Sequence, residues 1–369
     1  MSQGTSGFQS FVGVDLHKCT VTLTAVDAGG EITRLKISTK SCGKIEDWLR
    51  SLAGPVWMAV EACPFVEWFI ERFRDCVDRI DIADATELAS RRGKRRKTDF
   101  NDSLDIAVRL SRGECPLGFI ADEELMQLRK RGRHWRNLSR LLARTKHSMK
   151  SMLNAANIRG PKFNAASAQR WFLAHGQLLK PVQQQAFGDF IDVLMLVERQ
   201  REHLRREILL AIRSERFAPR IALLMTVPGI GEIWACIIAA EIGPFDRFPN
   251  ADTLEFWAGL TADMKESAGR TQSGNITKAG STALRWALCQ AAVTLCQCDA
   301  KQEATRQRLI RRRGNAIANV AMGRRLLRIL FAMVRDGKPY EGGPRRDRTR
   351  GANEAKRRRK QRKEHAMAA

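Results

Sequence analysis

Several acidic residues stand where carboxylates could together hold a metal ion. Asp15 lies inside the apolar run Phe11–Leu16, on the opposite face from its apolar neighbours if the run is a strand. Glu61 closes a second apolar run, and Asp99 and Asp102 share one face at the start of a predicted helix. Carboxylates brought together repel one another unless a cation lies between them, and Mg²⁺ prefers oxygen ligands. We therefore expect Asp15, Glu61, Asp99 and Asp102 to bind Mg²⁺ or Mn²⁺.

The same acids also suit ordinary structural positions. Asp99 and Asp102 match the acidic first turn of a helix, where the helix dipole favours negative charge, and Glu61 suits an exposed strand end. Asp105, one further helical step along, is an alternative fourth ligand. His17 and the later histidines show no metal-binding spacing, which predicts surface or core positions for them.

Basic residues directly precede the acidic helix and are abundant in the whole chain. The basic run that extends from Arg91 to Lys97 would hold a phosphate backbone beside a metal site, although such a run also suits a solvated loop. Over 369 residues the formal net charge is +24, which favours a polyanionic partner. The segment Arg345–Lys363 alone holds eleven Lys or Arg residues against two acids. The basic residues of the run are Arg91, Arg92, Lys94, Arg95, Arg96 and Lys97.

Composition excludes several classes of protein. The nine cysteines form no paired CxxC spacing, so neither a zinc site nor a disulfide framework is predicted. The sequence has no apolar run long enough for a membrane span, and its first residues lack the pattern of a signal peptide. These features predict a cytoplasmic, nucleoid-associated bacterial protein with no membrane partner.

The N-terminal third must position the acids, and its pattern predicts a mixed α/β sheet. Three short strands over residues 11–16, 20–26 and 31–37 form a meander. Helices over 44–53, 65–75 and 101–110 then alternate with strands over 56–60 and 79–83. Antiparallel strands followed by strand and helix alternation indicate a mixed sheet.

The remainder of the chain is predicted to be mainly helical. Beyond Asp122 the apolar residues recur at intervals of seven, which predicts a long coiled-coil-like helix, and a second such helix follows the break at Asn157–Pro161. The two could pair as an antiparallel stalk or pair between subunits. A third, Ala-rich region begins near Ile221 and ends near Val334. The residues after Gly337 are predicted to be disordered until they meet nucleic acid.

This third region carries a series of short motifs, and the acidic motifs of the N-terminal third precede it in a fixed order. The series runs through Val227–Glu232, Ala258–Leu260, Glu266–Ser267, Gly274–Lys278, Gly280 and Leu284–Arg285; the acidic motifs are Gly13–Asp15, Val60–Ala62 and Lys97–Asp102. In order and spacing the whole set resembles transposases of the insertion sequence 110 family, the group described as bridge-RNA-guided recombinases. The resemblance covers roughly residues 11–334.

The resemblance implies a fold and a chemistry that the residues alone do not establish. It implies a RuvC-like or RNase H-like domain whose Asp-Glu-Asp-Asp set falls on Asp15, Glu61, Asp99 and Asp102, and a C-terminal domain that donates a serine. It assigns the serine to Ser267, in a loop where Ser273 is the rival. Without the resemblance Ser267 would be taken for an ordinary polar residue, because no base is visible nearby in the sequence.

The resemblance also implies an activity and partners. These are cleavage and rejoining of donor and target DNA through a 5′-phosphoserine intermediate, guidance by a structured RNA, and a site shared between protomers of a homodimer or homotetramer. Lys278 and Arg285 are expected to contact nucleic acid. A metal-only RuvC-like nuclease or Holliday junction resolvase, which would not need Ser267, is the alternative enzyme. A nucleic-acid-binding protein without catalysis is the alternative outside that class.

The expected organisation has four parts. Residues 1–120 form the metal-binding domain, residues 121–216 the coiled-coil linker, residues 217–336 the helical domain with the catalytic serine, and residues 337–369 the basic tail.

Overall fold

The computed structural model describes residues 5–342 apart from 85–86, 89–97, 268–269 and 279. The basic run predicted to hold phosphate, with Arg91, Arg92, Lys94, Arg95, Arg96 and Lys97, lies outside the described residues, as does the segment 343–369. The chain divides into two compact units, Met1–Ala121 and Asp122–Ala369.

The first unit is built on one mixed sheet with the order β3-β2-β1-β4-β5-β6. The first three strands pair antiparallel, β4 and β5 add parallel to β1, and β6 closes the edge antiparallel. This arrangement confirms the expected mixed sheet. The strands are β1 (Ser10–Leu16), β2 (Thr20–Asp27), β3 (Ile32–Ser38), β4 (Val56–Glu61), β5 (Arg79–Ala83) and β6 (Leu117–Gly118).

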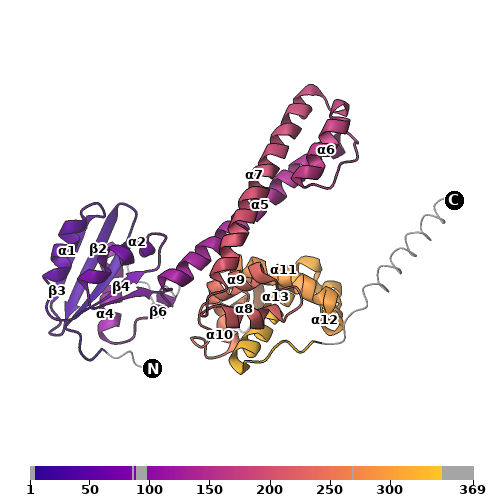
Figure 1. Ribbon diagram of the computed structural model, residues 1–369. Helices are drawn as coiled ribbons and strands as arrows, with labels where there is room; N and C mark the ends of the chain where they lie inside the picture. Colours follow the sequence, from indigo (N-terminus) through magenta and orange to yellow (C-terminus); the bar gives the residue numbers. More distant parts are fainter. Residues whose placement is uncertain (1–4, 85–86, 89–97, 268–269, 279, 343–369) are drawn as a thin grey trace. The chain divides into compact units, whose positions relative to one another are not determined.

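Helices cover both faces of this sheet (Figure 1). Val12 and Val14 of β1 pack with α1 (Cys42–Arg50) and α2 (Val66–Phe73) in one core. The alternate residue Phe11 packs in a second core with α4 (Asp99–Ser111). Because neighbouring side chains of a strand point to opposite faces, Asp15 belongs to the α4 face. A short 3-10 helix, η1 (Arg74–Cys76), follows α2.

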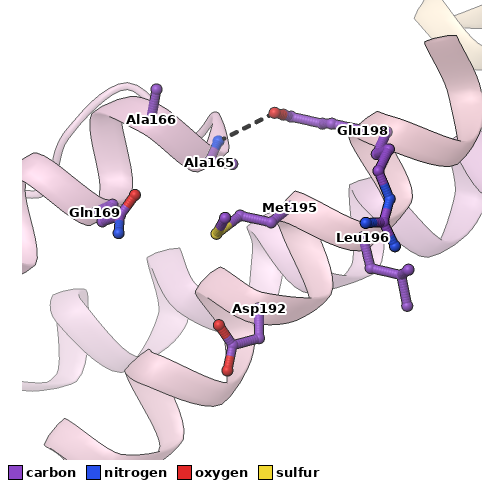
Figure 2. A pocket seen from close by; sticks show the side chains of 8 residues that line it. Ala165, Ala166, Gln169, Asp192, Met195, Leu196 and Glu198 are labelled. Carbon is purple, nitrogen blue, oxygen red and sulfur yellow. Dashed lines mark hydrogen bonds between the residues drawn. The ribbon is translucent and has the colours of Figure 1, made fainter.

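The second unit begins with a helical stalk. α5 (Glu123–Ala155) and α7 (Pro181–Ala211) lie side by side and antiparallel within one chain (Figure 1). Between them, α6 (Ala165–His175) and the 3-10 helix η2 (Gly176–Leu178) pack at the tip. A hydrogen bond beside a pocket between α6 and α7 holds the two helices together: the Ala165 N–H donates to Glu198 Oε2 at 3.2 Å (Figure 2).

The stalk joins a bundle of shorter helices through its base. Glu241, almost fully buried, accepts two hydrogen bonds from Arg133 at 2.7 and 2.9 Å, and Arg129 donates to the Ala240 carbonyl at 2.6 Å. A buried carboxylate paired in this bidentate way fixes α5 against α9. The helices are α8 (Ala218–Met225), α9 (Glu232–Ile242), α10 (Ala251–Trp257), α11 (Thr282–Cys298), α12 (Ala300–Arg313) and α13 (Asn315–Asp336).

One element of this region differs from the helical expectation. β7 (Ala262–Ser267) and β8 (Arg270–Ile276) form an antiparallel hairpin between α10 and α11. Ser, Thr and Asn compete with helical hydrogen bonding through their own side chains, which explains why this polar stretch is not a helix. None of the helices within the described ranges is long and apolar enough to cross a membrane.

Candidate functional site

The docking of α4 onto the sheet determines where the acids lie. A Cβ atom at Gly13 would come within 2.0 Å of the Ser103 carbonyl oxygen and 2.6 Å of the Ala107 nitrogen, so only glycine lets β1 and α4 approach this closely. The buried hydroxyls of Thr24 and Ser103 share a hydrogen bond of 2.7 Å. These contacts hold the first turn of α4 beside the end of β1.

Three side chains meet at that point. Asp15 Oδ2 lies 3.4 Å from His17 Nε2, and Asp99 Oδ1 lies 3.9 Å from the same nitrogen. One ligand atom from each residue falls within 4.8 Å of the others. Asp15 is buried, whereas the His17 side chain is 57% exposed, so the group lies at the surface end of the strand. We call Asp15, His17 and Asp99 the acid–histidine group.

A lysine from the sheet partly balances the charge of this group. Strand register aligns Asp15 with Thr22 and Thr22 with Lys36, so Lys36 shares the α4 face. Its Nζ donates to Asp99 Oδ2 at 2.8 Å. This hydrogen bond is the main reason why the pKa of Asp99 lies below its ordinary value, and the charges of Lys36 and His17 add to the effect.

The remaining expected ligands lie on the same elements. Glu61 is the last residue of β4, whose parallel register with β1 brings Glu61 to the same edge as Asp15. Asp102 is buried on α4, one turn after Asp99. Glu61 and Asp102 are outside the metal-like group found among the described residues. Burial raises the pKa of the Cys63 thiol, and the charges of Glu61 and Asp15 raise it further.

Asp105, the alternative ligand, is engaged elsewhere on its own helix. Its Oδ2 accepts from Arg109 Nε at 3.0 Å, one helical turn along. Asp105 therefore has a cationic partner already and is not a member of the acid–histidine group.

The donor set fits a divalent cation. Asp99 binds Lys36 through Oδ2, while its Oδ1 is the atom nearer His17. Asp15 and Asp99 thus offer hard carboxylate oxygens, which suit Mg²⁺ and Mn²⁺, whereas the imidazole of His17 suits Mg²⁺ less well. Two carboxylates held this close repel each other, and a cation between them would relieve that repulsion.

His17 of this group and its neighbour Lys36 are residues of the site that sequence patterns did not identify. His17 forms no long-range ligand spacing, but it stands two residues after Asp15, and its N–H closes the turn to β2 by donating to the Thr20 carbonyl at 2.9 Å. Lys36 can be assigned to this face only when the register of the β2–β3 pair is known. Both signals are local, and both require the strand ends to be known.

The predicted serine lies on the β7–β8 hairpin of the second unit. Ser267 is the last residue of β7 and pairs with Arg270, while Ser273 of β8 pairs with Met264. Ser267 therefore ends a strand next to the hairpin turn, where the sequence alone predicted a loop. The side chains of residues 263–275 lie outside the described part of the structure.

The base of the hairpin is closely packed. A Cβ at Gly280 would come within 2.2 Å of the Trp257 carbonyl oxygen, and the Lys278 N–H donates to the Gly259 carbonyl at 3.2 Å. Lys278 is exposed and has a φ of 57°, in the left-handed region that costs energy for a residue with a side chain. Such strain is common in loops that have a functional role.

Arg285 has a structural function at the same base. Its Nη1 donates to the carbonyls of Ala258 at 3.2 Å and Gly280 at 2.6 Å, and burial lowers its pKa. The guanidinium thus ties α11 to the hairpin base. The expected contacts of Arg285 and Lys278 with nucleic acid stay predictions.

Comparison with known proteins identifies the region that contains this hairpin. The family model described as "Transposase IS116/IS110/IS902 family" matches residues 221–308. This range begins in α8 and ends within α12, so it includes Ser267, Lys278 and Arg285.

Individual relatives extend the similarity over the rest of the chain. A probable family 20 transposase of Pseudomonas aeruginosa is 24% identical over 342 residues, which cover 90% of this chain and 99% of that protein. An uncharacterized protein of insertion element IS110 from Streptomyces coelicolor is 28% identical over 150 residues, 40% of this chain and 36% of that protein. A similar protein of insertion element IS116 from Streptomyces clavuligerus is 25% identical over 156 residues, 41% of this chain and 37% of that protein.

Proposed function

We propose that this chain, a transposase of the insertion sequence 110 family, cuts and rejoins DNA with Ser267 as nucleophile and with Asp15, Glu61, Asp99 and Asp102 as ligands of Mg²⁺ or Mn²⁺. The observation that supports the proposal best is the acid–histidine group, in which two carboxylates from separate elements lie within 4.8 Å of one imidazole nitrogen. A purely structural pair of acids would gain nothing from this closeness.

The proposed reaction is a transfer of a DNA phosphate to the serine. The Ser267 oxygen forms a bond to phosphorus while the bond from phosphorus to the 3′ oxygen of the DNA breaks. The serine proton ends on that 3′ oxygen, and the 5′ end stays attached to the enzyme as a phosphoserine ester. The 3′ hydroxyl of another strand then reverses the step, so the strands rejoin without a further energy source.

The carboxylates and the serine have separate tasks in this scheme. Asp15 and Asp99 would hold the cation, with Glu61 and Asp102 as the further ligands of the set. When bound, the ion stabilises the charge that develops on the phosphate. His17 and Lys36 orient the two aspartates through the contacts at 3.4 and 2.8 Å, and the hydrogen bond from Lys36 favours the ionised form of Asp99.

Finer features of the proposal rest on the family. The order of the sheet, three antiparallel strands followed by parallel β4 and β5, supports a RuvC-like or RNase H-like domain. A guide RNA that pairs with donor and target DNA would leave only backbone and shape contacts to the protein, which suits a net charge of +24. A site completed by a second protomer is part of the same proposal.

A metal-only nuclease is the second candidate, and one observation favours it. The acid–histidine group is assembled entirely within the first unit, so it does not depend on the hairpin that carries Ser267. Water would then be the nucleophile, and substitution of Ser267 would leave cutting intact.

The metal ligands are tested by three matched substitutions. Asp15→Asn and Asp99→Asn each remove a charged ligand while preserving shape, and Asp105→Asn is the control because Asp105 pairs with Arg109. We expect the first two to lower Mg²⁺-dependent cleavage at least about a hundredfold, since several kcal/mol of charge stabilisation are lost.

DNA binding in the presence of a chelator should be the same for all three variants and the wild type. Full cleavage by Asp15→Asn and Asp99→Asn would refute the metal site. Greater damage from Asp105→Asn than from Asp99→Asn would move the fourth ligand one helical step along α4.

A further inference from the structure

A stretch that is rich in arginine and has no acidic residue lies near the end of the folded chain. From Ala304 to Arg335 the sequence contains nine arginines and no aspartate or glutamate. A sequence pattern cannot tell which of these guanidinium groups serve the fold and which are available to a partner. The structure separates them.

Five of the nine arginines are bound to protein acceptors. Arg306 donates to Asn315 and Asn319, Arg324 and Arg328 pair with the buried Glu255, Arg325 donates to Gln302, and Arg335 pairs with Asp336. The contacts of Arg306, Arg324, Arg325 and Arg328 hold α10, α12 and α13 together, and Arg335 pairs within α13.

The other four arginines form a cluster on the last two turns of α12. Arg308, Arg311, Arg312 and Arg313 are all exposed, and among the described residues no hydrogen bond or ion pair holds any of them. Arg308, Arg311 and Arg312 stand at i, i+3 and i+4 and so share one helix face. We call these four residues the α12 arginine cluster.

Helix stability alone does not account for this cluster. Cations in the last turn of a helix interact favourably with its dipole, which suits Arg311, Arg312 and Arg313. Arg308 lies before that turn, and four adjacent like charges repel one another in the free protein. α12 packs on α11 and α13 (Figure 1), and the four arginines of the cluster stay exposed.

We propose that the α12 arginine cluster binds the phosphate backbone of duplex DNA. The planar guanidinium group matches a phosphate with two parallel hydrogen bonds, and several of them along one helix face suit successive phosphates. No aromatic residue lies between Ala304 and Ile317, so the segment that carries the cluster offers none of the stacking side chains on which single strands and RNA loops are usually held. The proposal rests on the proposed function, because it names a surface for the DNA on which that chemistry acts.

The test compares two variants that lose the same charge. The cluster variant carries Arg308→Gln, Arg311→Gln and Arg312→Gln. The control variant carries Arg74→Gln, Arg170→Gln and Arg213→Gln, three exposed arginines scattered over both units. Glutamine has nearly the helix propensity of arginine, so α12 should persist. Binding of the full chain to a duplex DNA of arbitrary sequence is measured by fluorescence anisotropy in EDTA over a range of salt concentrations.

We expect the cluster variant to lose at least about tenfold in duplex affinity near 0.1 M salt. The salt slope, the steepness with which log K falls against the logarithm of the salt concentration, should be lower by about 2.7 if three phosphate contacts are lost. The control should stay within about threefold of the wild type, because scattered charges make fewer phosphate contacts. Arg308→Lys, Arg311→Lys and Arg312→Lys together should recover most of the binding, since they restore the charge. If the triple Gln variant unfolds, Arg308→Gln and Arg312→Gln are measured singly: each should lower the salt slope by about 0.9, and slopes equal to the wild type would overturn the proposal.

Equal losses in the cluster and control variants would overturn the proposal, because net charge would then account for binding. A loss confined to a single-stranded or duplex RNA of matching length would overturn it as well. Because EDTA prevents cleavage, the result is independent of Ser267. Conversely, a failure of the serine mechanism would leave the binding difference between these two variants unchanged.

Discussion

The group around Asp15 shows how single residues combine stability and chemistry. A buried carboxylate is costly unless it is compensated, and here a half-exposed histidine lies beside it, while the second acid nearby adds repulsion that a cation would relieve. Alternation along the first strand predicted that Asp15 faces away from the main core, and the two cores on either side of β1 agree with that assignment. The roles of His17 and Lys36 depend on turn closure and on strand register, which the sequence alone does not determine.

Tyr340 is the only tyrosine of the chain, and its contacts extend the folded region past α13. Its hydroxyl donates to Asp299 Oδ2 at 2.8 Å, and its N–H donates to Thr226 Oγ1 at 3.0 Å. The sequence pattern instead predicted that the disordered tail begins at Gly337. An isolated aromatic residue in a polar segment gave no periodic signal, so this contact could not be predicted.

The titration of Tyr340 tests this contact. Burial, followed by the hydrogen bond to Asp299, raises the pKa of Tyr340 to about 12 from an ordinary value of 10.0. The stability that this residue contributes is therefore fully present below pH 10 and is lost as the pH rises through about 12. Ultraviolet absorbance of tyrosinate should give a midpoint near 12. Asp299→Asn retains an N-cap for α12 and should move the midpoint toward 10. A wild-type midpoint near 10 in folded protein would contradict the assignment.

At the scale of elements, the approach of α4 to β1 positions the candidate site. Gly13→Ala should destabilise the protein by about 1–3 kcal/mol or more, because the added methyl group collides with the backbone of α4. Urea unfolding monitored by circular dichroism measures the loss. Gly43→Ala in α1 is the matched control, since no atom lies within 4 Å of its added Cβ, and it should leave stability unchanged or raise it by up to about 1 kcal/mol. Equal stability of the two variants would mean that α4 adapts to the methyl group.

The elements differ in how well their sequences predicted them. The first strand was expected over residues 11–16 and runs over Ser10–Leu16, and the helix expected over residues 101–110 runs over Asp99–Ser111. Strong apolar alternation or helical periodicity explains both successes. The β7–β8 hairpin was not predicted, because its residues are mostly polar and their sequence has no alternating apolar pattern from which a period could be read. The assignment of the nucleophile to Ser267 therefore depended on the family resemblance.

At the scale of the whole molecule, the basic tail and the folded region are expected to contribute differently. Truncation after Gly342 removes the segment with eleven Lys or Arg residues and should lower both nucleic-acid affinity and its salt dependence, with an unchanged melting temperature. Truncation after Gly337 also removes Tyr340 and should lower the free energy of unfolding by about 0.5–1.5 kcal/mol. Differential scanning calorimetry and anisotropy titrations separate the two effects. A loss of folding on the shorter truncation would show that residues beyond Gly342 are structural.

The serine mechanism makes a demand that no other account of this chain makes: the protein must become covalently attached to DNA. Labelled substrate is incubated with the protein and Mg²⁺, and the products are separated by denaturing electrophoresis. We predict a protein–DNA adduct that withstands boiling in detergent, and its loss, together with loss of recombination, in Ser267→Ala, while DNA binding persists. An adduct lost in Ser273→Ala instead would move the nucleophile to β8. Normal cutting without any adduct in both the wild type and Ser267→Ala would contradict the account and identify a metal-only nuclease.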